Sequence, residues 1–283
     1  MSPLSLLLAS ALLIGDEPEV RVTLQSNTKL IAPGEVFELA VLLEYDPGWH
    51  VYWKNPGDSG FATTAELSAP PGFTVESPRY PAPVSFEQSG GFTCYGYEES
   101  ACLFFKVTAP RELIGDEFSF TASAKYLICE EVCFSGEVEG DAKLKREVTT
   151  KSSDANYNKE VRAHLKRLPR PLLPEWKQAQ VKLTGSKKTP TLSLWLPDQD
   201  QDGATRMAMS AEFYPDPLAG LNLRAPVIKR GEAGLEIKVP CKFRPQKKQP
   251  IPATEGVISV KTHEGELLHL SFSAEWSDSA APN

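Results

Sequence analysis

The stretch EFSFTASAKYLICEEVCFSGEVEGDAKLKREV, residues 117–148, predicts two β-strands joined by a tight turn. Its centre, Glu130-Glu131-Val132, has the length of a three-residue hairpin loop. Cys129 and Cys133 flank this loop, so a hairpin would place them directly opposite each other across the two strands. The stretch therefore predicts an antiparallel sheet that ends in a closely spaced cysteine pair.

Strand-like segments also precede this hairpin. VRVTLQSN (20–27) alternates with period two, and EVFELAVLLEY (35–45) follows a Pro-Gly turn. GWHVYWKNPG (48–57) places its tryptophans on one face and His50 and Tyr52 on the other. Turn signals recur roughly every ten residues, which is typical of an antiparallel β-sandwich of immunoglobulin-like type.

The second half of the chain repeats this pattern after an interruption. The interruption holds a polar stretch, a short helical pattern that Ser153 or Asp154 would cap, and a run of prolines that ends it. Strand-like segments then return. The predicted fold class is all-β, with two immunoglobulin-like β-sandwich domains (16–148 and 176–276), a short helix and Pro-rich linker (149–175) and a tail (277–283).

Length and charge limit the function. A chain of 283 residues is long enough for two domains with buried cores. The net charge of −7 argues against nucleic acid and anionic membranes as partners. The apolar run within residues 1–15 is too short to span a bilayer and fits a signal peptide, although no Lys or Arg precedes it. We therefore expect an exported, soluble protein without a membrane span of its own.

The spacing of Cys129 and Cys133 favours an exchangeable disulfide. Opposed Cβ atoms in a hairpin lie about 4.5–5.5 Å apart, whereas a disulfide prefers about 3.5–4.5 Å. Closing so small a ring stabilises a fold by only about 2 kcal/mol. Glu130 and Glu131 disfavour a neighbouring thiolate, and the motif has no cation to offset them. We expect the pair to react mainly when the thiolate of a partner protein attacks it.

Other interpretations of the cysteines stay open at this point. The spacing alone also fits a purely structural disulfide of a secreted sandwich, and a copper-handling CxxxC site is a further alternative, although that site usually needs a distal His or Met. Five cysteines are an odd number, so at least one is unpaired within the chain. Cys94 and Cys102 form a candidate second pair, and Cys241 is expected to be a small buried hydrophobe. No metal or cofactor is expected.

Three motifs in the first half point to a known family. GWHVYWKNPGDSG (48–60), YGYEES (95–100) and YLICEEVCFSGEV (126–138) together resemble the N-terminal periplasmic domain of the thiol:disulfide interchange protein DsbD, in its ScsB-like branch. The resemblance covers about residues 20–145. It implies an immunoglobulin-like domain with Cys129 and Cys133 as the redox-active pair.

The resemblance also implies a cap that shields the disulfide until a partner docks. The matching segment is 85–99, and Trp49, Tyr52 and Trp53 are interpreted as scaffold. The candidate shielding residues are Phe86, Glu87, Phe92, Tyr95 and Tyr97, together with Phe134, which follows the second cysteine.

The resemblance further implies a function. We expect a periplasmic, or otherwise extracytoplasmic, protein-disulfide reductase component that relays electrons through Cys129 and Cys133. Its expected partners are a separate membrane thiol reductase and thioredoxin-like periplasmic proteins. The alternatives are a non-enzymatic binding or assembly module with a structural disulfide, and the copper-handling protein. The second predicted domain carries no recognisable chemistry, and a docking or spacer role is expected for it.

Overall fold

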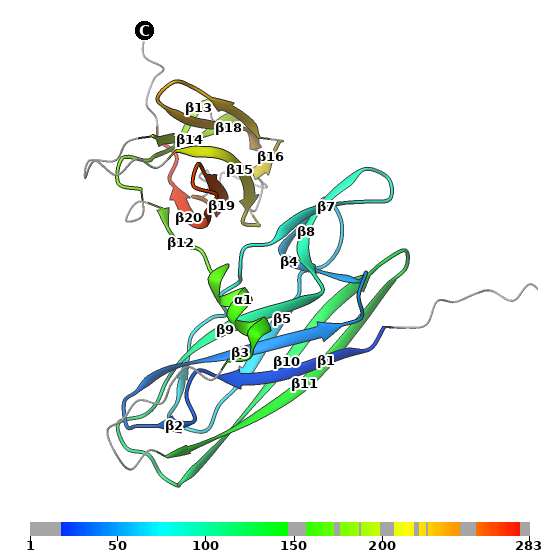
Figure 1. Cartoon of the computed structure of the whole chain (residues 1–283), viewed down its shortest axis with the longest axis vertical. Coiled ribbons are helices and arrows are strands. Elements are labelled where there is room, and N and C mark those ends of the chain that lie inside the picture. Colours follow the sequence, from blue (N-terminus) through cyan, green and yellow to red (C-terminus); the bar gives the residue numbers. More distant parts are fainter. Residues whose placement is uncertain are drawn as a thin grey trace, which may run out of the picture.

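The computed structural model describes residues 18–146, 157–172, 176–186, 188–198, 207–217, 221–224, 226–243 and 253–277. The predicted signal peptide and the predicted helix caps Ser153 and Asp154 lie outside these residues. Two β-sandwiches follow each other along the chain, and helix α1 (Lys159–Lys166) lies between them in sequence (Figure 1). The all-β fold class predicted from the strand pattern is confirmed.

The first sandwich packs two sheets against each other. One sheet has the order β1-β3-β9-β6, and the other has the order β2-β11-β10-β4-β8-β7 with β5 paired to β10. The strands are β1 (Val20–Ser26), β2 (Leu30–Ile31), β3 (Val36–Tyr45), β4 (His50–Gly57), β5 (Thr64–Ser68), β6 (Thr74–Val75), β7 (Val84–Gln88), β8 (Phe92–Glu98), β9 (Ser100–Thr108), β10 (Glu117–Cys129) and β11 (Cys133–Arg146).

Strand β3 is apolar on both of its faces because both faces are covered. Leu39 and Leu43 point into the core between the two sheets. Leu42 instead packs with Val161 of α1, on the outer face of the same sheet. The helix begins at an N-cap different from the two predicted, since the side chain of Asn158 accepts a hydrogen bond from the Val161 amide at 2.9 Å. The short helix therefore belongs to the first sandwich by packing.

The long hairpin β10–β11 forms as predicted. Its register runs from Glu117 opposite Lys145 to Cys129 opposite Cys133, without an interruption. Strand β4 pairs with the last residues of β10, so that His50 lies opposite Cys129. The cysteine pair therefore stands at one end of the sandwich, next to the start of β4.

The second sandwich has its own core. Its sheets have the orders β12-β20-β19-β15 and β13-β14-β18-β16, with β17 paired to β18. Leu194, Ile237, Ile258 and Leu270 are fully buried between them. The strands are β12 (Arg170–Pro171), β13 (Gln180–Ser186), β14 (Thr189–Pro197), β15 (Ala208–Pro215), β16 (Leu221–Leu223), β17 (Val227–Arg230), β18 (Gly234–Phe243), β19 (Thr254–Thr262) and β20 (Leu267–Ala274).

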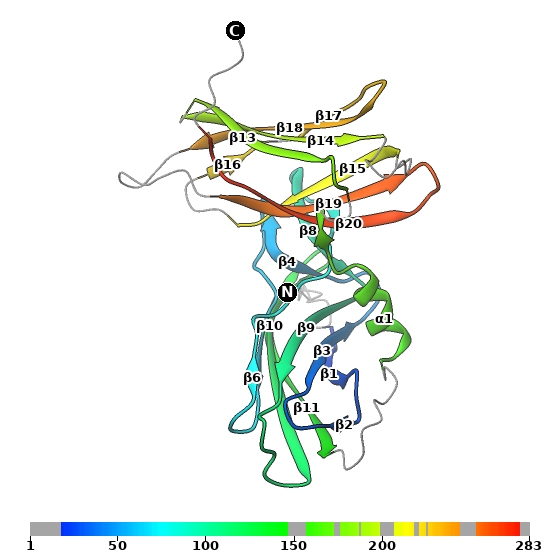
Figure 2. The ribbon, with the colours of Figure 1, turned by 90° about the vertical axis from the view of Figure 1, so that its left-hand side faces the viewer.

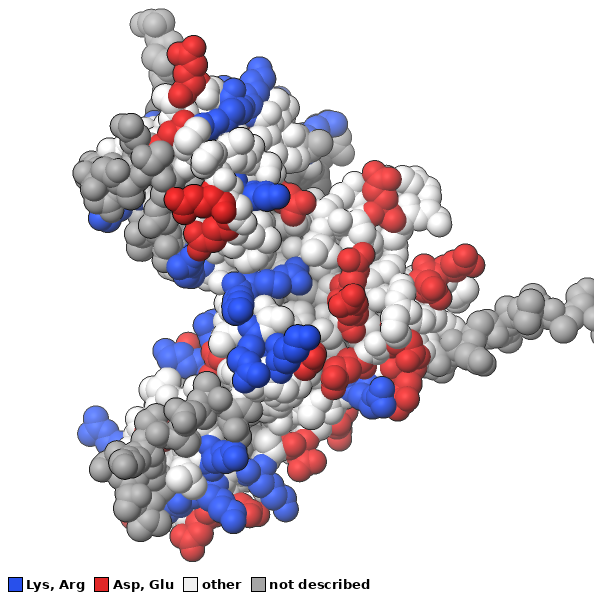
Figure 3. Space-filling view, in the orientation of Figure 1, with Lys and Arg blue, Asp and Glu red and all other residues white. Residues whose placement is uncertain are grey.

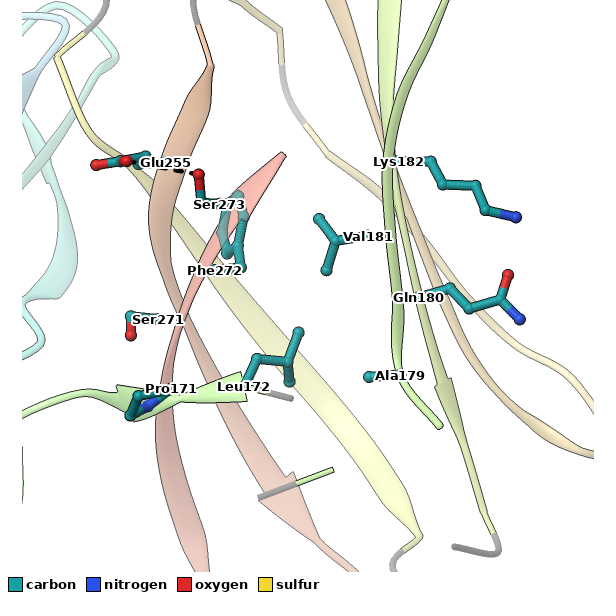
Figure 4. Close-up of a pocket in the computed structure, with 10 residues that line it drawn as sticks. All are labelled: Pro171, Leu172, Ala179, Gln180, Val181, Lys182, Glu255, Ser271, Phe272 and Ser273. Atoms are coloured by element: carbon teal, nitrogen blue, oxygen red, sulfur yellow. Dashed lines mark hydrogen bonds between the residues drawn. The ribbon is translucent and has the colours of Figure 1, made fainter. Parts of the chain in front are cut away.

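A groove of about 700 Å³ opens at one edge of the second sandwich, between β13 and β20. Val181 and Phe272 point into it from the two sheets, whereas Gln180 and Lys182 point away (Figure 4). The groove is the unclosed edge between the two sheets, because β13 and β20 belong to different sheets and share no ladder.

The two sandwiches touch through β15 on one side and β4 and β8 on the other (Figures 1 and 2). Tyr214 of β15 lies edge-on to Tyr95, with ring centroids 5.4 Å apart, and 6.3 Å from the Trp53 ring. Lys54 Nζ lies 2.6 Å from an oxygen of Asp216. The second sandwich therefore rests on the strands that lead to the cysteine pair.

Candidate redox site

Cys129 and Cys133 form a disulfide, with their Cα atoms 4.2 Å apart. The two sulfurs differ in their surroundings, because Cys129 is fully buried while Cys133 is exposed. The difference follows from strand pairing: Cys129 ends β10 where β4 pairs with it, whereas Cys133 starts β11 on the side of the hairpin away from β4. Access from solvent is therefore to Cys133.

The buried sulfur has one hydrogen-bond donor. The Tyr52 hydroxyl lies 3.2 Å from Cys129 Sγ, and Tyr52 itself is buried on β4. Its ring lies against Gly60, where an added Cβ would come within 2.3 Å of it. Gly60 also has a φ of +102°, which disfavours any other residue. The loop after β4 thus holds Tyr52 in place by close backbone approach.

Gln88 extends this contact into a network. Its amide nitrogen donates to the Tyr52 hydroxyl and lies 3.0 Å from His50 Nε2, while its amide oxygen accepts from the Cys94 thiol at 3.3 Å. Burial raises the pKa of Tyr52 and of Cys94, and burial lowers the pKa of His50. All three groups are therefore held neutral near pH 7, and the network brings no fixed charge to Cys129.

Of the predicted shielding residues, Phe86 lies closest to this network. It packs against the cluster of Tyr52, Cys94 and Cys129, and its ring centroid is 4.4 Å from that of His50. Phe134 contacts Trp49 at 5.9 Å, on the other side of the hairpin. Their shielding role stays a prediction.

The remaining shielding candidates lie elsewhere. Phe92 and Glu87 are exposed near the tip of the β7–β8 hairpin. Tyr95 faces the second sandwich instead of the disulfide. Tyr97 is fully buried in the core, and its hydroxyl donates to the Pro81 carbonyl at 2.8 Å. The structure therefore brings Tyr95 and Tyr97 to the interface and the core, away from the disulfide cluster.

The candidate second pair is not joined in the structure. Cys94 and Cys102 are both buried free thiols, and they belong to two different clusters. Cys94 lies with Tyr52 and Cys129, whereas Cys102 lies under α1, because β8 and β9 belong to opposite sheets. Cys241 is a buried free thiol in the core of the second sandwich, as expected.

Three residues at the site have functional contacts that the sequence does not predict. The motif resemblance indicates a scaffold role for Tyr52, and it implies no role for His50 or Gln88. The alternation along β4 does place His50 and Tyr52 on one face, which was a usable signal once β4 is paired with β10. Gln88 had no such signal, since a polar residue near a hairpin tip is ordinarily exposed.

The described part of the chain gives two further observations. It contains no helix long and apolar enough to cross a bilayer. It also contains no group of three or more His, Cys, Asp or Glu side chains placed to hold a metal ion.

Comparisons with known proteins give a family match and similar solved domains. Residues 20–144 match the family model of the thiol:disulfide interchange protein DsbD, N-terminal. The N-terminal periplasmic domain of ScsB from Proteus mirabilis is similar at 16% identity with a TM-score of 0.58, covering 93% of this chain and 95% of that one. The Neisseria meningitidis DsbD n-terminal domain in the reduced form aligns at 14% identity and a TM-score of 0.28, covering 48% and 90%. No curated protein matches the chain.

The resemblance predicted from the three motifs is thereby confirmed for the first sandwich. The ScsB domain shares the fold across both sandwiches. The family match and the disulfide together support a thiol–disulfide interchange domain in the first sandwich.

Proposed function

We propose that this domain of the DsbD N-terminal type passes electrons between two extracytoplasmic thiol proteins through Cys129 and Cys133. One observation supports this most directly: the disulfide has one exposed sulfur and one buried sulfur that already has a hydrogen-bond donor. A disulfide used only as a staple needs neither feature. The proposed electron donor is a separate membrane thiol reductase, and the proposed acceptors are thioredoxin-like proteins.

Electrons enter when a thiolate of the donor attacks Cys133 Sγ, because that sulfur is the exposed one. A mixed disulfide forms, the Cys129–Cys133 bond breaks, and its electron pair leaves with Cys129. A second donor thiol then attacks the mixed disulfide, which releases the oxidised donor and leaves both cysteines reduced. Two electrons and two protons have been taken up.

Electrons leave by the reverse sequence. The Cys133 thiolate attacks the disulfide of the acceptor and releases one acceptor thiol. The Cys129 thiolate then attacks Cys133 Sγ, which restores the disulfide and releases the acceptor with both of its cysteines reduced. Cys133 is thus the exchanging cysteine and Cys129 the resolving one.

The Tyr52 hydroxyl stabilises the Cys129 thiolate that forms when the disulfide opens. When the disulfide opens, this hydroxyl is already 3.2 Å from the sulfur that becomes a thiolate. A hydrogen bond to an ionised group contributes more than one between neutral groups. Tyr52 therefore favours opening without needing a cation at the site.

Redox titration of the full chain tests the proposal. A midpoint within the range of thiol–disulfide oxidoreductases, about −120 to −270 mV, is expected, and one below about −300 mV would make the disulfide structural. Cys129→Ala, which keeps the exposed cysteine, should trap a mixed disulfide with a thioredoxin-like protein. Cys133→Ala is the matched variant and should trap little, because its remaining thiol is buried.

A further inference from the structure

Negative charge is concentrated at the disulfide end of the first sandwich. The segments that build this end are 46–62, 84–99 and 126–136, and they hold seven of the chain's 37 carboxylates but one of its 30 lysines and arginines. The remainder of the chain is almost balanced, so these segments account for nearly all of the net charge of −7. The seven, all exposed, are Asp46, Asp58, Glu87, Glu98, Glu99, Glu130 and Glu131.

Cations within these segments do not offset that charge. The one lysine, Lys54, is paired with Asp216 of the second sandwich at 2.6 Å. His50 is held uncharged by burial, which lowers its pKa. In Figure 3 the charged side chains on the side of the first sandwich where the β7–β8 and β10–β11 hairpins end are mostly red. A molecule approaching Cys133 therefore meets a negative field.

Three of these carboxylates lie near the disulfide in the strand pairing. Glu130 and Glu131 lie in the loop between the two cysteines, and Glu130 folds over Gly48, where an added Cβ would be 3.1 Å from its carboxylate oxygen. Glu98 lies opposite His50 on the neighbouring strand, and His50 lies opposite Cys129. Glu98 is thus separated from the disulfide by a single strand, β4, and Glu130 and Glu131 are next to it in sequence.

Exposed apolar side chains lie in the same three segments as these carboxylates. Val132, between the cysteines, is 56% exposed, and Phe92, opposite Gln88 in the β7–β8 hairpin, is 47% exposed. Phe61 is 73% exposed and follows Gly60, which touches the Tyr52 ring. Exposed apolar side chains together with polar and charged ones are typical of a protein-docking surface.

We propose that the acidic surface formed by residues 46–62, 84–99 and 126–136 docks thiol proteins whose reactive cysteine is surrounded by Lys and Arg. The same surface disfavours the approach of thiol compounds that carry negative charge. The proposal rests on the proposed exchange at Cys133. Opposite charges at this range accelerate encounter and like charges slow it, and added salt removes both effects. The surface would thereby select partners before any sulfur chemistry begins.

Peptide thiols of defined charge test this without a known partner. Three capped pentapeptides carry a central cysteine flanked by four Lys, four Ser or four Glu residues. We expect the Lys peptide to reduce the disulfide of the full chain at least about tenfold faster per thiolate than the Glu peptide at low ionic strength, with the Ser peptide between them. The rates should converge near 1 M salt, where the Debye length is about 3 Å.

Reversing the charge of the loop between the cysteines tests whether the preference for the Lys peptide arises there. Glu130→Lys/Glu131→Lys should abolish or invert the preference. Glu112→Lys/Asp116→Lys is the matched control: it makes the same charge change at the other end of β10, about 40 Å away, and should leave the preference intact.

The outcomes separate this inference from the proposed function. A disulfide that all three peptides reduce readily and at equal rates at low salt would overturn the docking proposal alone. Equal loss of preference in both double variants would also overturn it, by assigning the effect to overall charge. A disulfide that resists every peptide would instead contradict the exchange function itself.

Discussion

Tyr52 and Trp53 are consecutive residues of β4, and their side chains point to opposite faces of the strand. The Tyr52 hydroxyl lies 3.2 Å from Cys129 Sγ, whereas the Trp53 ring packs against Tyr214 of the second sandwich. The same alternation recurs on β8, where Cys94 belongs to the disulfide cluster and Tyr95 contacts Tyr214. Two strands thus join the disulfide cluster to the second sandwich.

Tyr52→Phe should slow opening of the disulfide. The variant keeps the ring but removes the hydrogen bond that the Tyr52 hydroxyl donates to Cys129 Sγ. Such a bond to a charged group is worth about 1.5–3 kcal/mol, so the rate of reduction by dithiothreitol should fall about tenfold or more. The pKa of Cys129 in the reduced protein, followed by alkylation rate against pH, should rise. An unchanged rate and pKa would show that Tyr52 only fills space.

Gly60→Ala should destabilise the first sandwich by more than the strain of placing alanine at a positive φ. The added Cβ would come within 2.3 Å of the Tyr52 ring, at a φ of +102°. Strain and overpacking together should lower the free energy of unfolding by about 2–4 kcal/mol in urea denaturation.

Gly91→Ala is the control for that substitution. Gly91 also has a positive φ, +76°, but nothing lies within 4 Å of its added Cβ. Its cost should stay near 1 kcal/mol. Equal costs at both positions would mean that the contact with Tyr52 is not a constraint.

Tyr214→Ala should uncouple the two sandwiches. Tyr214 is 1% exposed, and its ring fills the contact between Trp53 and Tyr95. Removing a buried aromatic ring costs about 3–5 kcal/mol, so calorimetry should show a lowered and split unfolding transition. Tyr214→Phe keeps the ring, loses only the hydrogen bond to Glu212, and should cost about 1 kcal/mol. Similar losses in both variants would contradict a packing role.

Stability should fall as the pH falls from 6.5 towards 4. Burial lowers the pKa of His164 to about 4 and that of His269 to about 4, against 6.5 in an unfolded chain. The unfolded state therefore binds more protons in this window, and stability is lost as the pH drops. By pH 5 the loss should be about 2 kcal/mol per histidine.

The variant His164→Gln isolates the contribution of His164 to this pH dependence from that of His269. The amide should keep the contact with the Ser100 hydroxyl, which lies 2.9 Å from His164 Nε2, but it does not titrate. Urea denaturation at pH 7 and pH 5 should show a smaller pH effect in this variant. An identical pH effect in the variant and the parent would assign the loss to other groups.

Local sequence signals predicted the strands and the cysteine pair because both depend on near neighbours. A three-residue loop is enough to place Cys129 opposite Cys133, and alternation with turn residues is enough to indicate a sandwich. The helix start was missed by a few residues, since Asn158 and the two expected caps are chemically equivalent candidates. Packing of Val161 on β3 decides among them.

The sequence by itself determined an all-β chain with a disulfide of low stabilising value at the end of a hairpin, and it carried the acidic residues around that disulfide. Tertiary structure alone decided which cysteine is buried, that Tyr52 donates to its sulfur while Gln88 donates to Tyr52, and that Cys94 and Cys102 are apart. The physical reason is that hairpin contacts follow from spacing along one stretch. Contacts among β4, β7, β8 and β10 depend on how strands distant in the chain are paired and in which register.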